Sequence, residues 1–450
     1  MIDKLQNNVN LVFSFVVMFA LCLIASYYPE MLIDYVKYIK MTVIDNYGYL
    51  FAWSGGLLLI IELFLIFSKY GNIKVGDDKP LFDNVSYWML ITACGIGVAP
   101  IFWSVMEPVA HISEGYTIQQ TMMWTFHNWL ILAGTYYGAF GVAFAFLSSR
   151  DKSWNVNSLF KNKVANHITN ISVAISTAIG LALTFLYVVE IIITQLPFTP
   201  SIWQAVLFVT FFTLLSSYHD IDKGVKTVAI ITIVSSLALI TVVYYNFSNY
   251  NLLTEWFKTW INYLINEPVL ILTTGETENE KSWLATWSYN YFASWVSAAV
   301  FLGLMLANIS KGRTIRSILI GSLFVPCIVC SLWFTVFGIS AINSNCEDSF
   351  QLVSLFDQSG LMLIAIACLC IMFFVVQHDC AGVVLQQLTS DNSKILWVII
   401  IACLTVAISY IPGDAVDILR NITTISSVPI LILVFFVFGK ALYEIRRSYK

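Results

Sequence analysis

The chain alternates long apolar segments with short polar ones from one end to the other. Twelve of these apolar segments approach the length of about 20 residues that a helix needs to cross a bilayer. They cover residues 11–28, 49–68, 87–105, 122–147, 169–194, 201–217, 226–246, 286–307, 317–341, 358–376, 395–411 and 423–442. Alternation at period two, which marks a membrane β-barrel, is absent from the sequence. The pattern therefore predicts an all-α polytopic membrane protein with 12 transmembrane helices.

The composition supports this prediction and argues against nucleic acid as a partner of the chain. Of the 450 residues, 58% are hydrophobic and only 11% are charged, whereas soluble domains carry about a quarter charged residues. The net charge is −4, and no basic run is long enough to follow a phosphate backbone. The sequence thus indicates a lipid bilayer, and not nucleic acid, as the surroundings of the chain.

The basic residues are divided unevenly between the polar segments that join the twelve spans. If the N-terminus is cytoplasmic, all but five of the 23 lysines and arginines fall in cytoplasmic segments. The five on the other side are Lys37, Lys40, Lys258, Lys281 and Arg420. Because positive charge concentrates on the cytoplasmic side, both termini are expected there, with the protein in the cell membrane.

One long external segment, residues 249–285, separates the seventh and eighth spans. It contains TEWFKTWINYLI, in which aromatic and aliphatic residues recur at helical spacing. This spacing predicts an amphipathic helix on the surface of the protein.

Residues 93–108 read ACGIGVAPIFWSVMEP and combine apolar character with residues that weaken a helix. Gly95, Gly97 and Pro100 predict a break in the third span. The break frees backbone carbonyl oxygens, which at membrane depth must face a cavity, an ion or a ligand. Close helix packing is the alternative role of such glycines. Glu107 follows, and we expect it near the external interface, where it satisfies a helix end or a neighbouring polar group.

Three stretches carry a family resemblance. They are SKYGNIKVGDDKPLFDNVSYWMLITACGIGVAPIFWSVMEPVAHI, SSYHDIDKGVK and ANISKGRTIRSILIGSLFVPCIVCSLWFTVFG, and ISKGRTIR in the third is the most specific. Together they resemble the betaine/carnitine/choline transporter family, over about residues 65 to 440. The resemblance implies a LeuT-like fold, in which two peripheral helices precede two five-helix repeats of opposite orientation.

The implied fold sets the expected boundaries. They are two peripheral helices in 1–68, a cytoplasmic loop at 69–85, a first five-helix repeat at 86–248, the external loop at 249–285, a second, inverted repeat at 286–443 and a short cytoplasmic tail at 444–450. The resemblance also implies a homotrimer.

Substrates of this family carry a trimethylammonium group, and the resemblance implies an aromatic cage for it on helices four and eight. Aromatic faces bind such a cation through the ring quadrupole, at about 0.5 to 2 kcal/mol for each face. Trp295 and Tyr136 keep two of the four cage positions, whereas Asn128 and Ala133 occupy the other two. Two faces cannot close a cage as four can, so the substitutions favour a substrate that is smaller, less methylated or more polar than betaine.

Neighbouring aromatic residues are candidates to complete the cage, although a shift of one residue turns a helical side chain by about 100°. Ser294 adds a hydroxyl group in the same region. The expected substrate-binding residues are Trp295, Tyr136, Trp129, Asn128, Ser294, Tyr291, Trp103, Gly95 and Gly97.

Sodium-coupled members of the family use carbonyl oxygens of helix three and hydroxyl groups of helix ten. The carbonyl oxygens near Ala93 and Ile96 remain here, and Asp379 matches an aspartate of the family, but Val376 and Gln377 replace the hydroxyl-bearing residues. A hard cation needs several oxygen ligands at close range. The sequence therefore disfavours sodium, and sodium-independent exchange is the alternative.

Two carboxyl groups lie within predicted spans, where an ionisable group is a functional candidate. Glu190 belongs to the first repeat at a position where the family has glutamine, and we expect it to carry a proton for coupling. Glu62 lies on a peripheral helix, and we expect it to snorkel or to sit at a subunit contact.

The sequence thus predicts a secondary active transporter that moves a small quaternary-ammonium or zwitterionic solute, of the betaine, choline or carnitine type, by alternating access. One alternative is a proton-coupled or exchanging carrier of another small amine or amino acid. Another is a non-transporting membrane sensor or receptor. No nucleophile–base pair, metal cluster or cofactor motif stands out, so we expect no enzyme, catalytic residue, metal or cofactor. Cys327 and Cys330 have metal-ligand spacing, but they lie in an apolar segment without polar partners.

Overall fold

The computed structural model describes residues 2–76, 79–151, 154, 156, 159–160, 162–196, 200–217, 224–357, 359–389, 393–411 and 415–447, with side chains from residue 9 onwards. The helices are α1 (Ile2–Tyr27), α2 (Pro29–Phe67), η1 (Lys69–Asn72), α3 (Asn84–Ile96), α4 (Ala99–Ser113), α5 (Ile118–Trp129), α6 (Ile131–Asp151), α7 (Lys163–Gln195), α8 (Ile202–Ser217), α9 (Lys226–Asn246), η4 (Ser248–Tyr250), α10 (Leu252–Leu272), α11 (Glu278–Thr286), α12 (Ser288–Ile309), α13 (Ile315–Leu323), α14 (Val325–Ser344), α15 (Ser349–Ser354), α16 (Leu361–Leu388), α17 (Lys394–Ser409) and α18 (Ala415–Arg447). The middle of the stretch SSYHDIDKGVK, residues 218–223, lies outside the described residues.

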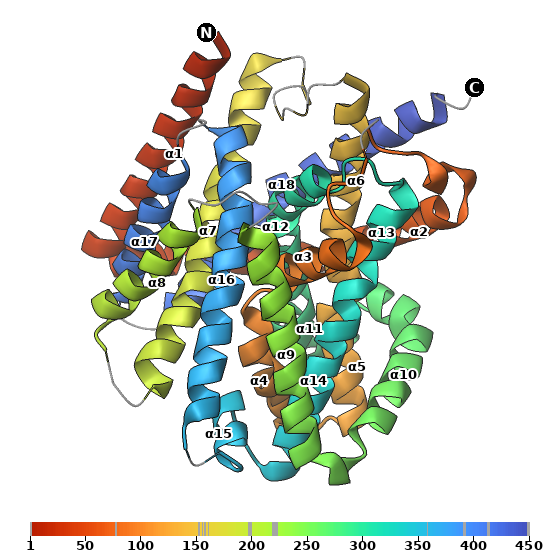
Figure 1. Cartoon of the computed structure of the whole chain (residues 1–450), viewed down its shortest axis with the longest axis vertical. Coiled ribbons are helices and arrows are strands. Elements are labelled where there is room, and N and C mark those ends of the chain that lie inside the picture. Colours follow the sequence, from red (N-terminus) through yellow and green to blue (C-terminus); the bar gives the residue numbers. More distant parts are fainter. Residues whose placement is uncertain are drawn as a thin grey trace.

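The helices pack into one bundle whose interior is formed by α3, α6, α7, α12, α14 and α16 (Figure 1). In the described part of the chain, nine helical segments are long and apolar enough to cross a membrane, and the bent pair α3–α4 makes a tenth. The apolar helices α8 and α17 are shorter, at 16 residues each. The prediction of a helical, multi-pass membrane protein is confirmed, and the count of twelve spans stays a prediction.

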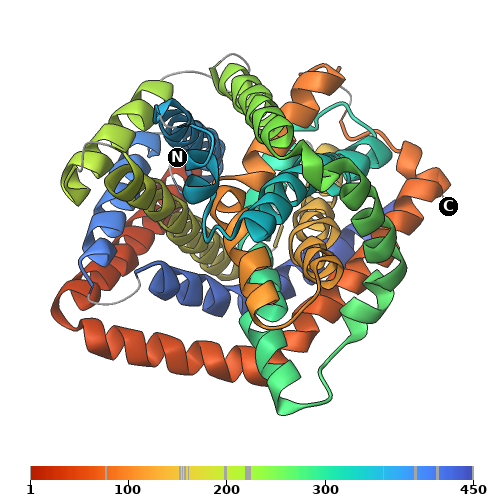
Figure 2. The same cartoon turned by 90° about the horizontal axis from the view of Figure 1, so that it is seen from below.

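Helix α2 is longer than the hydrophobic pattern indicated. The 39 residues of this helix include the segment 29–48, which the pattern left between the first two spans. Leu32, Val36 and Ile44 are buried at helical spacing along that segment, so one apolar stripe continues into the span. Figure 2 shows α2 running along the outside of the bundle before it joins the other helices.

Several spans are broken, and the breaks occur in two pairs. Helices α3 and α4 meet at an angle of 57°, and α5 and α6 are separated by the single non-helical residue Leu130. In the second half of the chain, α11 and α12 meet at Trp287, and α13 and α14 meet at Phe324. The sequence predicted the first of these breaks from its glycines and proline, but not the other three.

Two of the stretches that carry the family resemblance contact each other. The backbone of Val75 exchanges hydrogen bonds with that of Gly312 and Arg313. The buried Arg313 guanidinium donates to the carbonyl oxygens of Phe82 and Asp83 and lies 3.8 Å from the ring centroid of Tyr87. The specific string ISKGRTIR therefore acts as a clamp that fixes the start of α3, the helix that leads to the break.

Helix α10 confirms the helix predicted in the external loop, and it lies at the outer edge of the bundle (Figure 1). Its buried side faces α5, where His127 Nδ1 and Glu267 Oε2 are 2.8 Å apart. The loop helix is thus joined to the broken span α5–α6.

Candidate functional site

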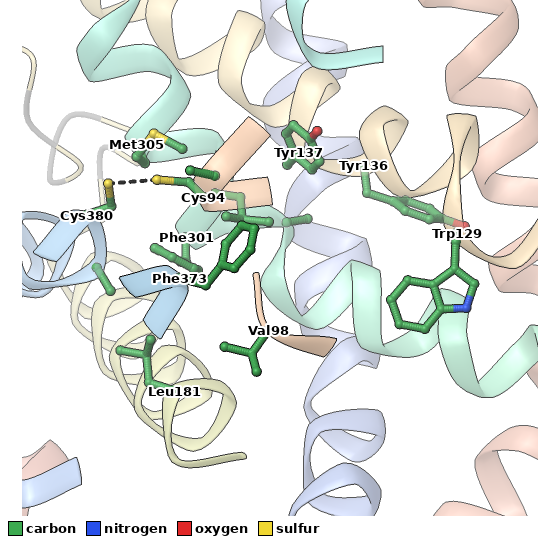
Figure 3. Close-up of a cluster of buried hydrophobic side chains, with 14 of the residues drawn as sticks. Cys94, Val98, Trp129, Tyr136, Tyr137, Leu181, Phe301, Met305, Phe373 and Cys380 are labelled. Atoms are coloured by element: carbon green, nitrogen blue, oxygen red, sulfur yellow. Dashed lines mark hydrogen bonds between the residues drawn. The ribbon is translucent and has the colours of Figure 1, made fainter. Parts of the chain in front are cut away.

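A central cavity of about 160 Å³ lies beside the break between α3 and α4. Residues 95–99, at the break, form one side of it, and residues of α4, α5, α7, α12, α16 and α18 form the rest. An apolar cavity of about 150 Å³ holds a molecule of the size of benzene. The cavity therefore fits one small solute. Val98, Leu181 and Phe301 are among the apolar side chains around it (Figure 3).

Aromatic rings form much of the wall of this cavity. The rings come from four helices and are those of Trp103, Trp129, Tyr187, Tyr291, Trp295 and Phe301. The Trp129 and Trp295 ring centroids are 5.5 Å apart, with the rings at 80°. Tyr291 lies 4.9 Å from Trp129 and 5.9 Å from Trp103. The tilted arrangement presents ring faces and edges from several directions, as a cage for an organic cation requires.

The polar edges of the three indoles are already bound within the protein. The Trp129 Nε1–H group donates to Glu107 Oε2 at 2.6 Å, and that of Trp295 donates to the Asn128 carbonyl oxygen at 2.9 Å. Trp103 Nε1–H donates to the Tyr187 hydroxyl at 3.2 Å. Because these bonds fix the rings and use their donors, the cavity offers a ligand the π-faces of the indoles.

Glu107 lies next to the aromatic wall of the cavity. It is fully buried, and besides Trp129 it accepts a hydrogen bond from Asn128 Nδ2 at 2.8 Å. The Asn128 side-chain oxygen in turn accepts from the Ser288 hydroxyl at 2.7 Å. The expected role of Glu107 toward neighbouring polar groups is confirmed, and its position near the external interface stays a prediction. Through these hydrogen bonds, Glu107 and Asn128 hold the Trp129 and Trp295 rings in place.

The structure does not bring Tyr136 to the cavity. The Tyr136 ring is fully buried, and its hydroxyl donates to the Phe51 carbonyl oxygen of α2 at 2.6 Å. Among the expected binding residues, those that line the cavity are Trp295, Trp129, Ser294, Tyr291, Trp103, Gly95 and Gly97. Tyr136 and the side chain of Asn128 lie outside it.

The helix break itself depends on Gly97, whose φ and ψ are 66° and −158°. The side chain of Gln377 from α16 occupies the space beside the Gly97 Cα. Gln377 Nε2 donates to the Cys94 carbonyl oxygen at 3.1 Å, so an amide satisfies one acceptor that the break leaves free. Figure 3 shows the neighbouring contact between α3 and α16, where the sulfur atoms of Cys94 and Cys380 are 2.9 Å apart.

The four expected coupling residues are dispersed. Ile96 lines the cavity, and Ala93 is fully buried on α3 one turn before it. Asp379 is buried among the hydroxyl groups of Ser216 and Ser217 and the Lys394 ammonium, which lies 3.5 Å from Asp379 Oδ1. Glu190 lies on the exposed face of α7, outside the cavity.

Two features of the cavity were not predicted from the sequence. Arg420 from α18 lines it, with its guanidinium carbon 5.6 Å from the Trp103 ring centroid. A cluster of hydroxyl groups joins Ser176, Ser297 and Ser426 through contacts of 3.1 to 3.2 Å. The predicted spans placed Arg420 on the external side, between residues 395–411 and 423–442. A basic residue beside two apolar segments could have marked Arg420 as a candidate. The serines are scattered along the sequence, and nothing in the sequence indicates that they meet. Within the described residues, no group of three or more His, Cys, Asp or Glu side chains is placed to hold a metal ion.

Comparison with known proteins places these features in a family. The model of the "BCCT, betaine/carnitine/choline family transporter" matches residues 10–450. The chain is 26% identical to glycine betaine transporter OpuD of Bacillus subtilis (strain 168), over 92% of this chain and 90% of that protein. It is 27% identical to a probable glycine betaine transporter of Desulfitobacterium hafniense (strain Y51), over 96% of each. It is 25% identical to the osmo-dependent choline transporter BetT2 of Acinetobacter baylyi, over 90% of this chain and 67% of that protein.

Proposed function

Because the chain belongs to the betaine/carnitine/choline transporter family, we propose that it is a secondary active transporter that moves a small quaternary-ammonium or zwitterionic solute across the cytoplasmic membrane by alternating access. Membership of this family makes it a transporter and not an enzyme. The observation that carries the choice of solute is the aromatic wall of the central cavity. A trimethylammonium group has no hydrogen-bond donor or acceptor, so rings whose donors are bound elsewhere suit it.

The arrangement of breaks supports the proposed fold. We propose twelve spans, with repeats at 86–248 and 286–443 after two peripheral helices in 1–68. The first repeat begins with the broken segments α3–α4 and α5–α6. The second begins at the break between α11 and α12 and continues with the broken segment α13–α14. Such a recurrence is expected of an inverted repeat, whose broken helices surround the substrate site. Cytoplasmic termini, as the lysines and arginines predict, and a homotrimer complete the proposal.

The cage identifies the ammonium end of the solute, and Arg420 favours a carboxylate at the other end. Arg420 Nη2 pairs with Asp417 Oδ1 at 2.7 Å, whereas its buried Nε has no hydrogen-bond partner in the described part of the chain. A guanidinium in the cavity wall attracts a carboxylate and repels a cation without one. A zwitterion such as glycine betaine is therefore favoured over choline.

Replacement of Arg420 tests this preference. In Arg420→Gln we expect the affinity for glycine betaine to fall about 10- to 100-fold, since a hydrogen bond to a charged group contributes about 1.5 to 3 kcal/mol. Choline affinity should stay the same or rise. Displacement of radiolabelled ligand from the purified protein measures both. Arg420→Lys keeps the positive charge but loses the paired N–H donors of the guanidinium. Its affinity for glycine betaine should lie between those of the wild type and Arg420→Gln. An equal loss for both ligands would contradict the assignment.

Coupling to sodium is not part of this proposal. The amide of Gln377 donates a hydrogen bond to the Cys94 carbonyl oxygen, and the side chain of Val376 supplies no oxygen. A cation would need several oxygen ligands at this place, whereas the two side chains offer an N–H donor and a single oxygen, Gln377 Oε1. The amide then stabilises the break in every ionic condition.

The experiment that tests the function is counterflow in proteoliposomes. Vesicles loaded with unlabelled glycine betaine are diluted into a trace of radiolabelled glycine betaine, in sodium medium and in potassium medium. We expect accumulation of label at the same rate in both media. A requirement for sodium would contradict the role given to Gln377. Absence of counterflow for glycine betaine, choline and carnitine, in protein that still binds one of them, would contradict transport and favour a sensor.

A further inference from the structure

Glu62 is a buried carboxyl group in the membrane-spanning part of α2. Its side chain is 0% exposed, and neither carboxyl oxygen has a hydrogen-bond partner within the described residues. The Thr135 hydroxyl lies beside it but donates to the Ile131 carbonyl oxygen at 3.0 Å. An unpaired carboxylate costs several kcal/mol in such surroundings, so they fit the neutral acid. The expectation that Glu62 snorkels or meets another subunit is wrong, because α6 and α13 cover it.

A hydroxyl group lies within reach of this carboxyl. Glu62 Oε1 and Ser322 Oγ are each 2.9 Å from the point where a Cβ atom on Gly138 would stand. A Cβ atom at Gly138 would clash with both oxygens, so glycine at this position leaves room for the carboxyl and the hydroxyl group on the same side of α6. The three residues come from α2, α13 and α6, so the carboxyl group lies where three helices meet.

Few charged or titratable groups face Glu62 from the helices that pack against it. On α6 it is Tyr137, whose hydroxyl donates to the Ser322 carbonyl oxygen at 2.9 Å. On α13 the cation is Arg316, whose guanidinium is bound to the carbonyl oxygens of Ile66 and Ser68 at the end of α2. The Arg316 guanidinium therefore stabilises the C-terminal end of α2, and neither Tyr137 nor Arg316 acts as a counter-ion for Glu62.

A second, small cavity joins this region to the central one. It has a volume of about 20 Å³, and its lining includes Gly95, Trp129, Tyr137, Trp295 and Ser322. A cavity of this size has room for about one water molecule. Tyr137 and Ser322 line it, and the Ser322 hydroxyl also lies beside Glu62, so a route for a proton from the cage to Glu62 passes these two residues.

We propose that Glu62 is the proton-binding site of the transport cycle. The carboxylate takes one proton from water of the central cavity along this route and is neutral in the conformation seen here. When the packing of α2 against α6 and α13 opens, the O–H bond breaks, the electron pair stays on the carboxylate and the proton passes to water. Solute movement is thereby linked to an inward flow of protons. This inference rests on the proposed transport function.

The test separates exchange of solute from coupling to protons. Proteoliposomes that contain wild type, Glu62→Gln or Glu190→Gln receive a trapped pH-sensitive dye. Counterflow of glycine betaine is measured at equal pH, and accumulation is measured with the outside more acidic. Glu190→Gln is the matched control, since it removes an exposed carboxyl group from another spanning helix.

We expect the wild type and Glu190→Gln to accumulate solute under the pH gradient and to acidify the lumen when glycine betaine is added. Glu62→Gln should keep counterflow within about threefold of wild type but show no accumulation above equilibrium and no acidification. Full coupling in Glu62→Gln would overturn the proposal, and so would loss of counterflow together with accumulation, which would mark a structural role.

Two further results keep the test decisive. If Glu62→Gln is not recovered folded, Ser322→Ala replaces it and should slow acidification more than counterflow; an equal effect on both overturns the proposal. A wild type without counterflow would instead contradict the transport function, whereas counterflow without proton movement would contradict only the role of Glu62.

Discussion

In Trp295→Leu, the affinity for glycine betaine is expected to fall by about 10- to 100-fold while the protein stays folded. The ring of Trp295 is half-buried in the cavity wall and meets that of Trp129 edge to face. Its loss removes one cation–π face, worth about 0.5 to 2 kcal/mol. It also leaves the Asn128 carbonyl oxygen without the indole donor, at a cost of about 1 to 3 kcal/mol. The unpaired carbonyl oxygen destabilises the free protein as well as the complex, so only part of its cost appears in the affinity. Because 1.4 kcal/mol is a factor of ten, a combined loss of about 1.5 to 3 kcal/mol gives the expected range.

Binding of glycine betaine, measured by calorimetry or ligand displacement, checks this result. Trp260→Leu is the matched control, because Trp260 is also half-buried and donates its Nε1–H group to Ser331 Oγ at 3.1 Å, but it lies on α10 away from the cavity. Trp295→Phe keeps an aromatic face and should lose less affinity than Trp295→Leu. Unchanged affinity in folded Trp295→Leu would show that the solute binds elsewhere.

The spans and the first helix break could be predicted from the sequence because each has a local cause. Apolar runs of membrane length admit few structures besides a helix, and Gly95, Gly97 and Pro100 weaken a helix wherever they occur. Trp103, Trp129 and Tyr291 were candidates for the cage on aromatic character alone, and the fold does bring them together with Trp295.

The exclusion of Tyr136 from the cage could not be predicted, because it follows from one backbone residue. Leu130 has φ and ψ of −101° and −108°, which end α5 and start α6 in a new direction. Residues before this break, such as Trp129, face the cavity, while Tyr136 after it faces α2. In an unbroken helix, the direction of each side chain follows from the 3.6 residues in each turn. The break at Leu130 changes this direction, so the side-chain directions that the family positions imply do not hold for the residues after it.

The two carboxyl groups show a second limit of the sequence. Glu190 belongs to a core helix and Glu62 to a peripheral one, so the pattern favoured Glu190 as the buried acid. Burial is decided by what packs on each face, and a sequence does not give the rotation of one helix against its neighbours. In the structure α6 and α13 cover Glu62, while Glu190 faces outward.

In Gly97→Ala, counterflow of glycine betaine is expected to fall below about one hundredth of the wild-type rate. The backbone of Gly97, at φ 66° and ψ −158°, lies in a region that is essentially open to glycine alone and costs about 1 to 3 kcal/mol for other residues. The new methyl group would also occupy the place of the Gln377 amide. Either the break straightens or Gln377 leaves the Cys94 carbonyl oxygen, and in both cases the cavity wall changes shape.

A matched control separates this effect from simple filling of the cavity. Gly180 also lines the cavity, and a Cβ atom there meets nothing within 4 Å, so Gly180→Ala should transport within about threefold of wild type. Gly97→Ala combined with Gln377→Ala removes the clash but keeps the backbone strain. Recovery of counterflow in the double variant would assign the loss to the amide, and continued loss would assign it to the backbone. Normal transport by Gly97→Ala alone would show that the break is not part of the site, since a straight α3–α4 helix would then suffice for the cycle.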